Sequence, residues 1–121
     1  MTAYEYMDLA YSGFGLVHTT VSLVIAILSG YLVVAYTVGS KLTRLQVSAL
    51  NIAYSVWASY LGASGALDFI RARSLVTAAA ELNAHISTPT AYMVHFYVSI
   101  GLLMWLASLW FMWIVRRAKA E

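Results

Sequence analysis

The chain has 121 residues, of which 62% are hydrophobic and 10% are charged, and its net charge at pH 7 is +2. Soluble domains usually carry about 25% charged residues, so this composition argues against a water-soluble fold and predicts a single membrane domain over residues 1–121. The absence of cysteine excludes disulfides, thiolate metal sites and cysteine nucleophiles. Because the net charge is small and the basic residues flank apolar segments, we interpret them as topology signals and expect no nucleic-acid partner.

Three apolar segments follow one another, at about residues 14–37, 45–67 and 91–115. Each is close to the roughly 20 residues that an α-helix needs to cross a hydrocarbon core of about 30 Å. Strands are not expected, because an open sheet edge in lipid would leave backbone polar groups without partners. The sequence therefore predicts an all-α integral membrane protein with three transmembrane helices.

Several helix ends are visible in the sequence. Residues 2–5 (Thr-Ala-Tyr-Glu) and 43–46 (Thr-Arg-Leu-Gln) both have the form of a capping box. Gly39 is suited to the end of the first helix. Thr88 followed by Pro89 predicts the start of the third helix, with the proline at its first position.

The segment from about residue 68 to residue 84 is less apolar, but it contains no proline or glycine. Most of its residues are good helix formers. We expect the second helix to continue through it, beyond the bilayer, and to stop near Asn83. The alternative is a loop that contains a short surface helix.

Orientation follows from the distribution of lysine and arginine. Five basic residues fall on one side, namely Lys41, Arg44, Arg116, Arg117 and Lys119, whereas only Arg71 and Arg73 fall on the other. The positive-inside rule then places the N-terminus outside and the C-terminus in the cytoplasm, in a bacterial inner membrane.

Small residues recur at helical spacing in the first two segments. Ser22, Ala26 and Gly30 lie on one stripe of the first helix, and Ser55, Ser59 and Gly62 lie on the second. Small side chains let helix backbones approach each other, so both sets are predicted to pack against helices. The alternative is a hydroxyl-lined path for an ion or substrate. The third helix is bulky nearly all round and is expected to face lipid or a large partner. Because three helices form a thin bundle with little interior, we expect a homo-oligomer or a place in a larger membrane complex.

Two histidines lie inside apolar segments, and ionisable residues there are candidates for function. His18 and His95 are predicted to lie at similar depth, with His18 facing the interior of the protein. Together they are a candidate site for haem b or a quinone, and the alternative is a structural hydrogen bond to Tyr or Ser. Asp68 and Arg71 lie three residues apart and are expected to form an interfacial ion pair.

No catalytic motif or metal site is recognisable in the sequence. We therefore expect a non-enzymatic membrane protein, either a self-assembling helical bundle or an accessory subunit, without a cofactor. One alternative is a redox subunit that uses His18 and His95. The other is a component of a channel or transporter.

Overall fold

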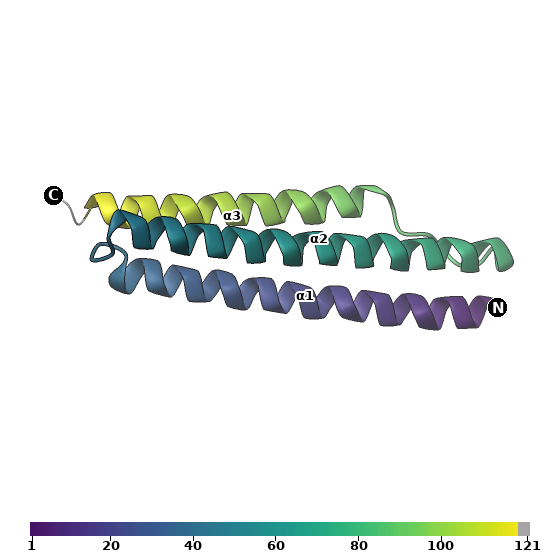
Figure 1. Ribbon diagram of the computed structural model, residues 1–121. Helices are drawn as coiled ribbons and strands as arrows, with labels where there is room; N and C mark the ends of the chain where they lie inside the picture. The colour runs from purple at the N-terminus through teal and green to yellow at the C-terminus, as the bar shows by residue number, and fades with distance from the viewer. Residues whose placement is uncertain (119–121) are drawn as a thin grey trace.

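The chain folds into three long helices, which confirms the all-α prediction. The computed structural model describes residues 1–118 and places α1 at Ala3–Val38, α2 at Arg44–Leu82 and α3 at Tyr92–Ala118. The helices lie side by side, and α1 and α3 run in the same direction, opposite to α2 (Figure 1). The α1–α2 loop and the end of α3 therefore share one end of the bundle, called the loop end below. The N-terminus and the end of α2 share the other end.

The first two helices begin where the sequence predicts. The Thr2 and Thr43 side chains accept hydrogen bonds from the backbone N–H groups of Glu5 and Gln46, and both capping boxes are complete. The third helix begins at Tyr92, so the predicted start at Thr88 and Pro89 is wrong. Arg73 Nε donates to the Pro89 carbonyl at 3.0 Å. This bond holds the residues before α3 in an extended connection beside α2.

The expected continuation of the second helix is confirmed. α2 runs to Leu82 and is followed by Asn83 as its C-cap. Its last turns project past the start of α3, and the connection to α3 folds back alongside them (Figure 1). Here α2 packs on the first turns of α1, where Ala10, Ala72 and Ala79 are fully buried. Small side chains bring these two backbones close together.

The core near the loop end is built from larger side chains. Tyr31, Tyr54 and Met112 are almost fully buried there and come from α1, α2 and α3 respectively. Gly39 ends α1 beside this cluster, and a Cβ atom added to it would lie 3.1 Å from Met112 Sδ. Glycine at this position lets α3 approach the α1–α2 loop.

Two helices, α1 and α3, are long and apolar enough to cross a membrane by length and composition. Only 11% of the most apolar stretch of each is buried, unlike the core helix of a soluble protein. The second segment does not meet the same criterion, because Asn, Ser and Tyr lower its hydropathy. Two helices are therefore candidate spans by length and composition, and the crossing of a membrane by three helices remains a prediction.

Candidate functional site

A group of hydrogen-bonded polar side chains joins all three helices inside the bundle. Tyr31 Oη donates to Asn51 Oδ1 at 2.8 Å, and the Tyr31 ring stacks on the Tyr54 ring with centroids 4.2 Å apart. Tyr54 Oη lies 2.8 Å from Ser108 Oγ, which itself donates to the Trp105 carbonyl at 2.7 Å. A serine hydroxyl has one hydrogen to donate, and that of Ser108 is donated to the Trp105 carbonyl. In the contact between the two hydroxyls, Tyr54 Oη is therefore the donor and Ser108 Oγ the acceptor.

The same group continues through a second contact between α2 and α3. Trp105 Nε1 donates to Ser55 Oγ at 3.0 Å. We call the six residues of this group the polar belt; they are Tyr31, Asn51, Tyr54, Ser55, Trp105 and Ser108. All of its side chains are neutral, and among residues 1–118 no buried side-chain nitrogen or oxygen lacks a partner. The belt is suited to fixing the register of three helices in an apolar medium.

The sequence pointed to only part of the polar belt. Ser55 lies on the predicted stripe of small residues on the second helix, but its partner was not identified. The position of Tyr31 in the sequence could have indicated a buried polar contact. It lies well inside its apolar segment, whereas tyrosine in membrane helices is usual near the interface.

The two candidate histidines do not meet within one chain. His18 and His95 are both exposed, so the expectation that His18 faces the interior is wrong. A buried contact forms two residues further along each helix, where Thr20 and Tyr97 converge on Gly65. This contact places the two histidines at the same level along the bundle. Two residues correspond to a rotation of about 200°, so both imidazoles turn away from the contact and from each other.

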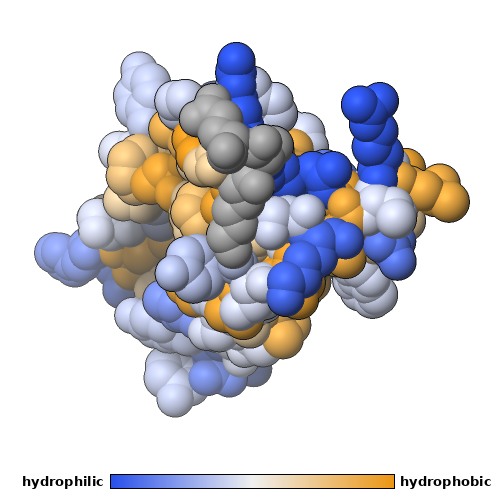
Figure 2. All heavy atoms as spheres, turned by 90° about the vertical axis from the view of Figure 1, so that its left-hand side faces the viewer, coloured by the Kyte–Doolittle hydropathy of each residue, from blue (hydrophilic) through white to orange (hydrophobic). Residues whose placement is uncertain are grey.

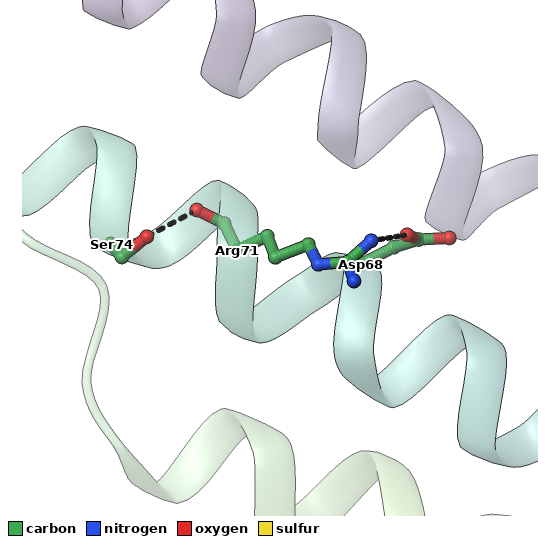
Figure 3. Close-up of polar contacts among 3 residues, drawn as sticks. All are labelled: Asp68, Arg71 and Ser74. Atoms are coloured by element: carbon green, nitrogen blue, oxygen red, sulfur yellow. Dashed lines mark hydrogen bonds and ion pairs between the residues drawn. The ribbon is translucent and has the colours of Figure 1, made fainter.

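Asp68 and Arg71 lie within ion-pair distance on α2. Arg71 Nη1 is 4.0 Å from Asp68 Oδ1, and the Arg71 side chain extends along the helix toward the carboxylate (Figure 3). Ser74 Oγ donates to the Arg71 carbonyl at 2.7 Å. The Arg71 side chain is 76% exposed and that of Asp68 is 22% exposed, so solvent screens the pair and its contribution to stability is small.

The close helix approach on α2 is found at Gly65 and not at the predicted Gly62. A Cβ atom on Gly62 would meet nothing within 4 Å, whereas one on Gly65 would overlap the Tyr97 hydroxyl. The two glycines lie about 60° apart around the helix, and only Gly65 faces the neighbouring helices. Ser55 also contacts α3, whereas Ser59 is exposed.

The small residues predicted to pack on the first helix face outward in the single chain. Ser22, Ala26 and Gly30 are exposed on the side of α1 opposite its contact with α2. They belong to a longer exposed face, which we call the small face of α1. It consists of Ser12, Gly15, Thr19, Ser22, Ala26, Ser29, Gly30, Val33 and Thr37. No aromatic or long aliphatic side chain interrupts it.

Two open hollows lie beside the helices. One, of about 370 Å³, lies between Phe14, Phe69 and the connection before α3. The other, of about 340 Å³, is almost entirely apolar and lies between α1 and α3, next to Leu32 and Phe111. Neither is lined by an acid, a base or a histidine, so neither offers a group for acid–base catalysis.

Among the described residues 1–118, no three His, Asp or Glu side chains lie close enough together to hold a metal ion. Among these described residues, Glu5 is the one titratable group outside the apolar segments whose pKa is clearly shifted. Its carboxylate accepts a hydrogen bond from the backbone N–H of Thr2 at 2.6 Å, which lowers the pKa of Glu5. This is a capping interaction and not a reactive site. Comparison with protein-family models, with curated proteins and with solved structures finds no match to this chain.

Proposed function

We propose that the chain is an integral membrane protein with three spans that assembles with copies of itself through the small face of α1. This role is non-enzymatic and belongs to a self-assembling bundle or to an accessory subunit. The observation that carries it is the composition of the small face, which no other part of residues 1–118 covers. Lipid tails do not drive apolar helices together, so helix contacts in a bilayer depend on close packing of small residues.

The spacing within the small face supports a helix–helix seam. From Ser12 to Val33 its positions can be followed at alternating intervals of three and four residues. This is the repeat of a left-handed helix pair, in which two α1 helices would cross at about 20°. Three of its hydroxyls, those of Thr19, Ser22 and Thr37, already donate to carbonyls of their own helix, at 3.2, 3.0 and 2.7 Å. They therefore add little polarity to the seam.

His18 provides a second reason to place protein against this face. It lies on the edge of the face, three residues after Gly15 and four before Ser22, and its side chain is exposed. An imidazole on a lipid-facing surface is costly, and such residues usually face other protein. A neighbouring copy of α1 would cover His18 and supply hydroxyl groups near it.

Three spans are also consistent with the charge distribution. Residues 45–67 of α2 contain no charged residue, which corresponds to about 34 Å of helix. We propose that the loop end is cytoplasmic and the N-terminus external, because basic residues concentrate at the loop end. If a reporter that works only in the cytoplasm is fused after Glu121, it should be active, and a reporter that works only outside the cytoplasm should be inactive there. An external C-terminus would refute this orientation.

Self-assembly is tested by the mass of the purified chain in mild detergent. Gly30→Leu should convert the oligomer to monomer, because a leucine side chain prevents close approach at the small face. Gly101→Leu is the matched control on α3. A Cβ atom on either glycine meets nothing within 4 Å in the single chain, so both variants should fold. A monomeric wild type, or equal masses for all three proteins, would refute the proposal.

The haem or quinone alternative receives less support, because His18 and His95 turn away from each other in one chain. A ligand held by both would have to bridge two chains. An absorption spectrum of the purified protein with a Soret band would favour that alternative. The transporter alternative also loses support, since Ser55 is bonded to Trp105 and Ser59 faces outward.

A further inference from the structure

Basic side chains from separate parts of the chain gather at the loop end of the bundle. Lys41 lies in the α1–α2 loop, Arg44 begins α2, and Arg116 and Arg117 lie in the last turns of α3. Seen from this end, strongly hydrophilic side chains project among weakly hydrophilic and apolar ones (Figure 2). Within residues 1–118 no acidic residue lies at this end, because all four acids lie toward the other end.

The two arginines of α3 are held in place by neutral groups. Arg116 Nη1 donates to the Gly39 carbonyl at 3.1 Å and to the Leu42 carbonyl at 2.9 Å. The Arg117 guanidinium lies over the Trp113 ring, 5.0 Å from its centroid. These contacts restrict both side chains, and within residues 1–118 neither guanidinium has an acidic partner.

The opposite end of the bundle is different. Its two arginines, Arg71 and Arg73, lie among four acidic residues of the same end, and Arg71 is within ion-pair distance of Asp68. The acids outnumber the bases there. The excess positive charge of the described chain is therefore confined to the loop end.

We propose that the loop end binds the headgroups of anionic phospholipids, with Lys41, Arg44, Arg116 and Arg117 as the phosphate-facing side chains. This inference rests on the proposed membrane insertion. Apolar side chains surround the basic ones, since Leu45 is 80% exposed, Trp113 is 53% exposed and Ile114 is 44% exposed. Such neighbours are suited to the headgroup boundary and not to a water-exposed protein partner. Arginine recognises phosphate through paired N–H donors, and lysine through its point charge.

The test measures lipid selectivity in bilayers. The chain is reconstituted in phosphatidylcholine that contains either brominated phosphatidylglycerol or brominated phosphatidylcholine, and tryptophan quenching reports the relative association constant. Each basic side chain at an anionic surface contributes about a fivefold preference, so wild type should favour phosphatidylglycerol at least fivefold. The preference should fall in 1 M salt, where the Debye length is about 3 Å.

Charge variants locate the effect. Lys41→Gln, Arg44→Gln and Arg117→Gln together should lower the selectivity strongly, and Arg116, which is retained, should leave a weaker residual preference. Arg71→Gln removes one positive charge at the opposite end and should leave the selectivity unchanged. Equal quenching by the two lipids in wild type, an unchanged triple variant, or an equal loss in Arg71→Gln would each overturn the inference.

Flotation separates this inference from the proposed function. A chain that floats with phosphatidylcholine vesicles but shows no lipid preference would refute only the headgroup site. A chain that does not float with either lipid would refute the membrane role and the headgroup site together.

Discussion

Gly65→Ala probes the closest contact between α2 and its neighbours. The added Cβ atom would overlap the Tyr97 hydroxyl and would lie 3.1 Å from Thr20 Cγ2. Overpacking of this kind costs about 1–3 kcal/mol. In the opposite direction, replacing glycine by alanine inside a helix raises the free energy of unfolding by about 1 kcal/mol, because alanine has the higher helix propensity. Gly62→Ala carries the same gain without a clash, so the two variants should differ in unfolding free energy by about 1–3 kcal/mol.

The difference can be measured by titrating the protein in mild detergent with sodium dodecyl sulfate and following helicity by circular dichroism. Tyr97→Phe removes the overlapping oxygen from the Gly65→Ala variant. It leaves the ring carbon Cζ, which would lie 3.1 Å from the new Cβ atom, so only part of the stability should return. Equal stability of Gly65→Ala and Gly62→Ala would refute the assignment of the contact to Gly65.

Further predictions concern the polar belt, the loop end and the first helical turn. Tyr54→Phe removes the hydrogen bond to buried Ser108 and should cost about 0.6–1.7 kcal/mol in the same titration, whereas Tyr60→Phe, at an exposed position, should cost nothing measurable. Arg116→Gln should accelerate hydrogen exchange in the α1–α2 loop, because two carbonyl contacts are lost, and unchanged exchange would contradict this. The pKa of Glu5 is lowered, so its cap should persist above the ordinary value of 4.5 and be lost as pH falls through the lower folded value; a carboxyl titration at or above 4.5 would refute it.

Helix positions and several ends follow from local sequence rules. Capping boxes act through residues three apart, so Thr2 and Thr43 could be assigned without any tertiary information. The start of α3 could not be assigned in this way. The Thr88-Pro89 pattern is a sound local signal, but the Arg73 side chain, which lies sixteen residues earlier, bonds to the Pro89 carbonyl and keeps this segment extended.

Facing directions required the assembled bundle. A stripe of small residues shows that some helix can approach, but it does not identify the partner. On α2 the close contact with the neighbouring helices is made at Gly65, which lies about 60° around the helix from the predicted Gly62. On α1 the contact with α2 uses residues such as Ala10, Tyr31 and Ala35, and the predicted stripe lies on the other side. The matched level of His18 and His95 along the bundle was inferable, but the exposure of both side chains was not.

The exposed faces of α1 and α3 differ in a way that separates protein contact from lipid contact. Large side chains such as Leu103, Leu106 and Trp110 are more than half exposed on α3, and they would fill a disordered lipid environment well. The small face of α1 presents short side chains and leaves its backbone accessible from outside. Lipid chains would make few dispersion contacts with such a surface, whereas a second helix can approach it closely enough to make many. The two surfaces are thus suited to different neighbours, and in the proposed assembly α1 is the helix through which a second copy would pack most closely.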